Sequence, residues 1–336
     1  MNILLTSAGR RTYLVNYFKN ALRGKGNVYA SNSIMTYTLS QADDCVITPD
    51  IYDDEYITFL LKYCKEKQIS AIISLFDIDL PVLAKNRGKF WANGVKLLVS
   101  DYEVTKICND KWGTYKYLRE LGLPQAKAYI DIEAVRQALR NKEVAFPLIL
   151  KPRWGMGSIG IYVVDTEQEL DVLYHKLHSE IFNTYLRFES RSDSEQCIII
   201  QEKLKGQEYG LEILNDLQCN YVTTFAKKKI AMRSGETDVA EIVDSTEFED
   251  IAGIIANNLK HIGILDTDCF KTDSGECIIL EMNCRFGGQY PFSHTAGADV
   301  PKQITEWLEG KATDFSLLRP RVGVKCCKEL VPVEIL

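Results

Sequence analysis

The chain has 336 residues, of which 46 are acidic and 40 are basic, so its net charge is −6. Its hydrophobic fraction of 46 % and charged fraction of 26 % are typical of globular proteins, and the length corresponds to about two domains. This composition excludes disordered, collagen-like and coiled-coil chains. The mild acidity argues against a nucleic-acid partner, because duplex binding depends on clustered Lys and Arg side chains.

No membrane segment or leader is predicted. Apolar runs stay well short of the roughly 18 residues that a membrane-spanning helix needs. The N-terminal stretch reaches Ser7, Arg10 and Arg11 too soon for a signal peptide. We therefore expect a cytoplasmic protein with no membrane partner.

Two groups of side chains are expected to have no chemical role. The ten cysteines contain no C-x-x-C pair and mostly lie in apolar stretches, which indicates reduced packing residues and not zinc ligands. The three lysines at 227–229 are expected on a solvated face.

The first hundred residues alternate short apolar runs with helical patterns. Strands are predicted at 3–6, 28–30, 71–75 and 95–99, and helices at about 14–22, 54–67 and 78–90. This alternation predicts a parallel sheet with right-handed crossovers. We expect a doubly wound α/β domain that ends near residue 100.

The remaining residues have a different, α+β character. Helices are predicted at about 101–122, 131–141, 167–178 and 246–261, and a polar surface loop at 189–196. Strands are predicted at 147–151, 160–164, 197–201, 207–214, 218–226, 264–271 and 276–282. The strand-rich part after 197 indicates a mostly antiparallel sheet backed by helices. Residues after 310, which include Pro320 and Pro332, are expected to form a short tail.

The first segment with chemical character runs from Lys151 to Gly160 and is rich in glycine. Glycines let backbone N–H groups approach a phosphate closely, and a lysine at the end of the preceding strand supplies a charge for phosphoryl oxygens. A β-hairpin with a flexible tip explains the pattern equally well. The segment matches neither the P-loop nor the dinucleotide motif, because it leads into a strand.

A second segment links two predicted strands between Gln201 and Gly210. A linker of this kind offers backbone donors and acceptors for the edge of an adenine, and a carboxylate there can accept hydrogen bonds from ribose hydroxyls. Surface carboxylates beside a turn are also commonplace, and this segment alone favours that interpretation.

The strongest segment is the strand at 278–282 and the residues that follow it. Alternation places Glu281 and Asn283 on one face, where their oxygen atoms can serve as hard ligands for Mg²⁺. Arg285 continues the same face and can meet a phosphate. Asp268 lies on the preceding strand, which a turn at 273–275 would pair with this one, and it could add a second carboxylate. A solvated strand face is the minority alternative.

Together these segments resemble the ATP-grasp superfamily over nearly the whole chain. The stretch Asn283–Gly288 is close to the N-P-R-F-G-G form of carbamoyl-phosphate-synthase-like members, with Cys284 in place of proline. The resemblance implies a Rossmann-like pre-ATP-grasp domain at 1–100, a small ATP-grasp lobe at 101–200, a large lobe at 201–310 and a tail at 311–336. The opening at 6–11 and the segment at 76–79 also resemble stand-alone proteins of this kind.

The resemblance also implies roles for individual residues. ATP would bind through two lysines, a phosphate loop within 154–160, an adenine hinge and a ribose carboxylate: Lys111, Lys151, Gly155, Met156, Gly157, Ser158, Gly160, Glu202, Lys203, Leu204 and Glu208. Mg²⁺ would bind Asp268, Glu281 and Asn283, and Arg285 would act in phosphoryl transfer. Arg233 lies where related enzymes place a substrate-facing basic residue, although a surface salt bridge is nearly as good an interpretation. His294 could line the acceptor pocket or be structural.

The implied activity is that of a carboxylate–amine ligase, which forms an acylphosphate from a small carboxylate and ATP and joins it to an amine, releasing ADP and phosphate. Two alternatives stay open: a carbamoyl-phosphate-synthase-like phosphorylation of carbamate or bicarbonate, and a non-catalytic ATP-binding module. A nicotinamide role is disfavoured because G-x-G-x-x-G is absent. Relatives are often dimers, so a homodimer is an expectation of the resemblance.

Overall fold

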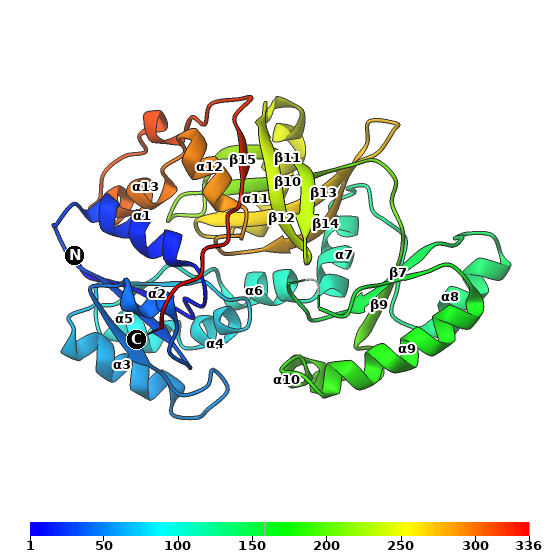
Figure 1. Cartoon of the computed structure of the whole chain (residues 1–336), viewed down its shortest axis with the longest axis horizontal. Coiled ribbons are helices and arrows are strands. Elements are labelled where there is room, and N and C mark those ends of the chain that lie inside the picture. The colour runs from blue at the N-terminus through cyan, green and yellow to red at the C-terminus, as the bar shows by residue number, and fades with distance from the viewer. Residues whose placement is uncertain (158, 336) are drawn as a thin grey trace.

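The computed structural model describes residues 1–157 and 159–335, which form three sheets (Figure 1). The first sheet has five parallel strands in the order β3-β2-β1-β4-β5. These strands are β1 (Ile3–Thr6), β2 (Val28–Asn32), β3 (Asp44–Ile47), β4 (Ala71–Ser74) and β5 (Lys96–Leu97). The helices around them are α1 (Thr12–Leu22), α2 (Tyr37–Ser40), α3 (Tyr56–Glu66), α4 (Asp79–Lys85) and α5 (Arg87–Ala92).

This sheet confirms the doubly wound architecture expected from the alternating pattern. Strands β1 and β4 are buried along their whole length, as parallel strands covered on both faces are. The chain adds β2 and β3 on one side of β1 and then β4 and β5 on the other. The carboxyl ends of β1 and β4 therefore form the crevice where open α/β sheets bind ligands.

The second sheet has four antiparallel strands in the order β6-β9-β7-β8. They are β6 (Ala128–Tyr129), β7 (Leu148–Pro152), β8 (Tyr162–Val164) and β9 (Ile198–Glu202). Residues 101–196 also form α6 (Tyr102–Asn109), α7 (Lys111–Glu120), α8 (Ile132–Arg140), α9 (Glu167–Phe182), α10 (Arg187–Ser190) and the 3₁₀ turn η1 (Arg191–Asp193). We call this part the small lobe.

Two expectations for the small lobe are wrong. The pattern at 101–122 predicts one helix, but the backbone of Asp110 is extended, and its side chain accepts a hydrogen bond from the Trp112 N–H and so begins a second helix, α7. The stretch at 189–196 is not a plain surface loop, because it contains the end of α10 and η1, and Ser190 within it is fully buried.

The third sheet has six antiparallel strands in the order β14-β13-β10-β11-β12-β15, and we call this part the large lobe. Its strands are β10 (Gln207–Asn215), β11 (Tyr221–Arg233), β12 (Glu236–Val243), β13 (Ile264–Lys271), β14 (Cys277–Asn283) and β15 (Lys325–Cys327). Its helices are η2 (Thr246–Phe248), α11 (Glu249–Leu259), α12 (Tyr290–Ala296), α13 (Val300–Leu308) and η3 (Phe315–Leu318). The expected tail is thus partly ordered, because β15 pairs with β12 at the edge of this sheet.

The first domain, α6, α7 and the large lobe share hydrophobic cores, whereas the rest of the small lobe has a core of its own. One buried cluster joins Leu4 to Leu211, and another joins Phe18 to Phe286. The core around Leu150 is separate, and Figure 1 shows the part of the small lobe that contains α8, α9, β7 and β9 projecting to one side. In the part of the chain that the structure describes, no helix combines the length and apolarity needed to cross a membrane.

Candidate active site

The pairing of β13 with β14 brings the predicted metal ligands together. Asp268 lies opposite Glu281, and Asp266 lies opposite Asn283. Residues opposite each other in antiparallel strands project from the same face. Met282, between the two predicted β14 ligands, is fully buried on the other face. This face therefore presents three carboxylates and an amide.

Buried ammonium groups balance the charge of these carboxylates. Lys229 Nζ lies 2.8 Å from Asp268 Oδ1 and 2.6 Å from Glu208 Oε1. Lys227 forms a fully buried ion pair with Glu212 at 2.8 Å. The expectation that the lysines at 227–229 lie on a solvated face is therefore wrong for two of them. Strand alternation turns both inward, where carboxylates on β10 and β13 compensate the cost of burying their charges.

The pKa values of the carboxylates reflect this balance. Burial by itself raises the pKa of Glu281, but the ammonium groups of Lys111 and Lys151 outweigh burial and lower it overall. Burial also raises the pKa of Asp268, and there it exceeds the opposing effect of Lys229. The surroundings thus favour the charged form of Glu281 and the neutral form of Asp268.

The two predicted phosphate lysines extend from the small lobe toward these carboxylates. Lys111 begins α7, and its Nζ lies 3.6 Å from Glu281 Oε2. Lys151 lies on β7, and burial lowers its pKa to about 8. Glu281 opposes that shift, whereas the like charge of Lys111 adds to it. Two ammonium groups and a carboxylate therefore face one another between the lobes.

The glycine-rich segment lies beside Lys111, whose ammonium donates a hydrogen bond to the Gly155 carbonyl. Gly157 and Gly160 both have positive φ values, which an L side chain would strain. A Cβ at Gly160 would also lie 2.7 Å from the Leu177 side chain. Met156 is half-buried in the same segment. Ser158, predicted to bind ATP, lies outside the described residues.

The predicted adenine hinge connects β9 of the small lobe to β10 of the large lobe. Both the backbone and the side chain of Glu202 bind Lys127. The Glu202 N–H donates to Lys127 O at 3.0 Å, and Glu202 Oε1 accepts from the Lys127 N–H at 2.8 Å. The Lys203 N–H donates to Pro147 O at 3.3 Å, and Leu204 is half-buried. Glu208 follows at the start of β10 and is held by Lys229. Adenine and ribose contacts for these residues stay predictions.

Arg285 lies between the first domain and the large lobe. Its Nη2 is 2.9 Å from Asp77 Oδ2, and its Nη1 is 3.2 Å from Asp266 Oδ2. Burial opposes the charge of Arg285, but the two carboxylates prevail and raise its pKa. Because Asp77 lies just after β4, Arg285 reaches the crevice at the carboxyl ends of β1 and β4.

Arg233 and His294 pair with residues other than these lysines and carboxylates. Arg233 Nε donates to Asp238 Oδ1 at 2.9 Å, and its side chain is 44 % exposed. This is the surface salt bridge that the sequence left open. The ring of His294 stacks on Tyr17 at 3.5 Å, and its Nδ1 lies 3.2 Å from the Tyr290 hydroxyl. Substrate contacts for both residues stay predictions.

Gln289 is a site residue that the sequence analysis missed. Its side-chain amide donates to Asp266 Oδ1 at 2.7 Å and to Asp268 Oδ1 at 3.2 Å, so it ties together two neighbouring carboxylates. The absence of a side chain at Gly210 makes room for it, because a Cβ there would lie 1.7 Å from Gln289 Oε1. Likewise, a Cβ at Gly287 would lie 2.1 Å from the Asp266 carboxyl carbon. The sequence shows both glycines, but it does not show which side chains pack against them.

The donor set fits a magnesium ion bound together with nucleotide. Mg²⁺ in proteins is held by one or two carboxylates, water and substrate phosphates, and seldom by a cage of protein ligands. Asp268, Glu281 and Asn283 supply such a partial set of hard oxygen ligands. Within residues 1–157 and 159–335, no three His, Cys, Asp or Glu side chains group into a complete metal site. The ammonium groups beside these carboxylates show that the face attracts positive charge.

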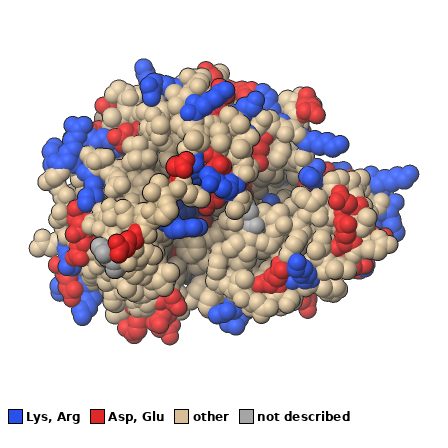
Figure 2. Space-filling view, in the orientation of Figure 1, with Lys and Arg blue, Asp and Glu red and all other residues tan. Residues whose placement is uncertain are grey.

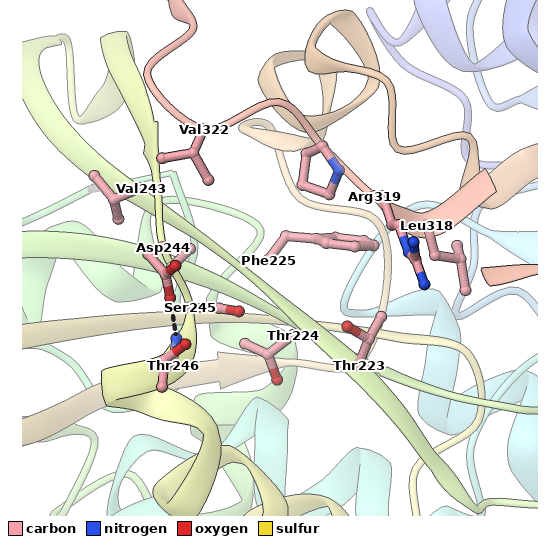
Figure 3. A pocket seen from close by; sticks show the side chains of 12 residues that line it. Thr223, Thr224, Phe225, Val243, Asp244, Ser245, Thr246, Leu318, Arg319 and Val322 are labelled. Atoms are coloured by element: carbon pink, nitrogen blue, oxygen red, sulfur yellow. Dashed lines mark hydrogen bonds between the residues drawn. The ribbon is translucent and has the colours of Figure 1, made fainter. Parts of the chain in front are cut away.

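Charged side chains also gather at the surface of the protein. Figure 2 shows Lys, Arg, Asp and Glu side chains gathered at the centre of one face, beside a hollow. A separate cavity of about 240 Å³ lies against β11, the end of β12 and residues 318–322 (Figure 3). Its lining includes Phe225, Asp244 and Arg319, and none of the predicted site residues is among the described residues that line it.

A doubly wound domain followed by two α+β lobes, with lysines and carboxylates converging between them, defines the ATP-grasp class of proteins. Residues 108–289, more than half of the chain, match the family described as ATP-grasp domain. Residues 3–98 match the family described as PylC-like, N-terminal domain. The chain belongs to the ATP-grasp family.

Curated relatives include large chains of carbamoyl phosphate synthase. The arginine-specific large chain of Bacillus subtilis (strain 168) is 24 % identical over 226 residues, which are 65 % of this chain and 20 % of that protein. The large chain of Clostridium acetobutylicum is 24 % identical over 273 residues, which are 77 % of this chain and 24 % of that protein. This chain therefore spans only a fifth to a quarter of the length of these relatives.

Solved structures share the fold over nearly the whole chain. The biotin carboxylase domain of Hydrogenobacter thermophilus 2-oxoglutarate carboxylase, solved with MgADP, ADP and bicarbonate, has a TM-score of 0.75 at 16 % identity and covers 96 % of this chain and 73 % of its own. An L-amino acid ligase from Bacillus licheniformis has a TM-score of 0.74 at 18 % identity. The match covers 99 % of this chain and 81 % of the ligase chain.

Proposed function

We propose that this protein is an ATP-dependent ligase that activates a small carboxylate as an acylphosphate and joins it to an amine. The observation that carries the proposal is the convergence of Lys111 and Lys151 from the small lobe on Glu281 of the large lobe. A polyphosphate with a bound cation would fit between the lobes, because the lysines can bind its oxygens and the carboxylate can bind the cation. Family membership supports the same activity.

Each part of the site has a proposed role in nucleotide binding. Lys111 and Lys151 would bind phosphoryl oxygens, and the segment with Gly155, Met156, Gly157, Ser158 and Gly160 would cover them. Backbone groups of Glu202, Lys203 and Leu204 would bind the adenine edge, and Glu208 the ribose. Asp268, Glu281 and Asn283 would hold Mg²⁺, which supplies charge neutralisation for the β- and γ-phosphates when bound.

The proposed reaction has two steps, formation of the acylphosphate and then formation of the amide. A carboxylate oxygen of the first substrate attacks the γ-phosphorus. The bond between that phosphorus and the oxygen that bridges it to the β-phosphorus breaks, and ADP leaves. An amine nitrogen then attacks the acyl carbon, the bond to the phosphate oxygen breaks, and inorganic phosphate leaves while the amine loses a proton. Lys111, Lys151 and Arg285 stabilise the negative charge in the first step through fixed, mostly buried cations.

The acceptor side of the site lies toward the first domain. Arg285 reaches from the end of β14 to Asp77 at the carboxyl end of β4, so the crevice of the first domain opens beside the proposed phosphoryl-transfer centre. The small-molecule substrates would therefore bind between the first domain and the large lobe. Their pocket would be closed on the nucleotide side by the small lobe.

A substrate-dependent assay of ADP release tests the proposal. Pools of amino acids and sugar acids would be screened as carboxylates and amines with the wild-type protein, and hits measured with Lys151→Ala and Glu281→Ala. Lys176→Ala and Glu276→Ala, which change exposed residues of the same two lobes, are matched controls. We expect turnover to be lost in the first two variants and kept in the controls. Unchanged turnover in both site variants would contradict the proposal.

The same assay separates the alternatives. ADP release that needs bicarbonate but no amine would indicate carbamoyl-phosphate-synthase-like phosphorylation, which the names of the curated relatives raise as a possibility. Mg-ATP binding without ADP release in any pool would indicate a non-catalytic ATP-binding module.

A further inference from the structure

Arg153 forms a buried clamp immediately after the strand that carries Lys151. Its Nε and Nη2 donate to the two carboxylate oxygens of Asp110, each at 2.7 Å. Its Nη1 donates to Asp193 Oδ2 at 3.0 Å. Arg153 is 9 % exposed, and its guanidinium lies over the Trp154 ring at 4.2 Å. A planar guanidinium can make this two-pronged contact with a carboxylate, and a lysine cannot.

The clamp joins the two short segments that carry the phosphate lysines. Asp110 precedes Lys111 and caps α7 through the Trp112 N–H at 3.0 Å. The Lys111 N–H donates to the Arg153 carbonyl at 3.1 Å. The two segments are therefore joined by a backbone hydrogen bond as well as by the side-chain ion pair. On the other side, the Arg153 N–H donates to Cys197 O at 2.8 Å, which anchors the end of β7 on β9.

Two ammonium groups held close together repel each other, so their spacing has to be imposed by the surrounding structure. The repulsion is visible in the pKa of Lys151, which the charge of Lys111 helps to lower. Glu281 attracts both lysines, but it belongs to the other lobe. Within the small lobe, the Arg153–Asp110 pair acts together with the Lys111 N–H bond to the Arg153 carbonyl in fixing the start of α7 against the end of β7.

We propose that Arg153 is a positioning residue that holds Lys111 and Lys151 at the spacing required by the β- and γ-phosphates of ATP. Arg153 does not touch the nucleotide in this proposal, because its guanidinium is already occupied by Asp110 and Asp193. The inference rests on the proposed function, in which both lysines bind phosphate.

The test compares nucleotides that do and do not carry the distal phosphates. Affinities for Mg-ATP and for AMP would be measured by calorimetry in wild type, Arg153→Met, Arg153→Lys and Asp110→Asn. We expect Arg153→Met to weaken Mg-ATP binding by about tenfold or more and to change AMP binding by less than about twofold. Arg153→Lys and Asp110→Asn should show the same pattern, because each removes the two-pronged contact while conserving size or polarity. These milder variants keep the test valid if Arg153→Met does not fold.

Arg136→Met is the matched control, because Arg136 makes ion pairs with Glu133 and Asp171 in the same lobe but contacts neither lysine segment. It should bind both nucleotides like wild type. Unchanged Mg-ATP affinity in the Arg153 and Asp110 variants would overturn the inference, as would an equal loss of Mg-ATP and AMP binding, which indicates a general structural role. Failure of the wild-type protein to bind Mg-ATP would instead overturn the proposed function and this inference with it.

Discussion

Arg285 and Asp77 form an ion pair across the boundary between the large lobe and the first domain, with Nη2 2.9 Å from Oδ2. The residues are 208 positions apart, and their side chains are 8 % and 7 % exposed. A buried pair of this kind fixes the proposed transfer centre relative to the crevice of the first domain.

Removing Asp77 should destabilise the protein, because it leaves part of a buried guanidinium charge uncompensated. We expect Asp77→Ala to lower the free energy of unfolding by about 3 kcal/mol, measured by urea denaturation. Asp54→Ala, at an exposed position of the same domain, should change it by less than about 0.5 kcal/mol. Equal stability of the two variants would show that Asp266 alone satisfies Arg285.

Mg-ATP affinity should fall as the pH rises through about 8. Burial lowers the pKa of Lys151 to about 8, so the free protein loses this charge above that pH, whereas phosphate binds the protonated form. Calorimetry between pH 7 and pH 9.5 should show weaker binding and proton uptake on the alkaline side. Lys151→Arg keeps its charge throughout this range and should remove that dependence. The same pH dependence in both proteins would contradict the assignment.

A methyl group at Gly210 should disrupt the carboxylate cluster. The Cβ of Gly210→Ala would lie 1.7 Å from Gln289 Oε1 and would force Gln289 away from Asp266 and Asp268. We expect a loss of about 1–3 kcal/mol in stability together with weaker Mg-ATP binding. Gly253→Ala, in helix α11 with open space around the new Cβ, should instead stabilise the protein by up to about 1 kcal/mol. Thermal unfolding of the two variants should therefore shift in opposite directions.

Acid should destabilise the fold through His261. This residue is fully buried, its Nε2 lies 3.1 Å from Ile213 O, and burial lowers its pKa to about 4 from an ordinary value of 6.5. Between these values the unfolded chain binds a proton that the folded protein does not, so stability falls as the pH falls from about 6.5 to about 4. The difference of about 2.5 pH units corresponds to about 3 kcal/mol.

The measurement is the unfolding free energy of wild type relative to His261→Gln across this pH range. The advantage of wild type should shrink by about 3 kcal/mol on acidification. His175→Gln, at an exposed position, should show a constant difference from wild type. A constant difference for His261→Gln would contradict the assignment.

Long apolar runs and strand alternation were sufficient to predict the elements that build the centre of the site. The predicted strand at 264–271 coincides with β13, and its predicted antiparallel pairing with the strand of Glu281 is observed, with Asp268 opposite Glu281. Strand β12 was missed because Glu236, Asp238 and Glu241 interrupt its apolar pattern, and it pairs near the edge of the sheet with β15. Such a strand is specified by its neighbours more than by its own residues.

The contacts that hold the site together could not be predicted from local patterns. Asp77 meets Arg285 only because the first domain packs on the large lobe, and no motif links two residues so far apart. Gln289 and Asp266 follow from the register of β13 and β14 and from the space above Gly210. The lysines at 227–229 were misassigned because a charged run indicates solvent unless its partners on adjacent strands are known.

Formation of an acylphosphate is tested most directly by following oxygen from the carboxylate substrate into inorganic phosphate. The carboxylate selected by the ADP-release screen would be labelled with ¹⁸O and turned over with ATP and the amine, and the released phosphate analysed by mass spectrometry. Attack of a carboxylate oxygen on the γ-phosphorus predicts one ¹⁸O atom in each phosphate released, and no product from Glu281→Ala. Phosphate without ¹⁸O, formed together with the amide product, would contradict carboxylate activation by phosphoryl transfer.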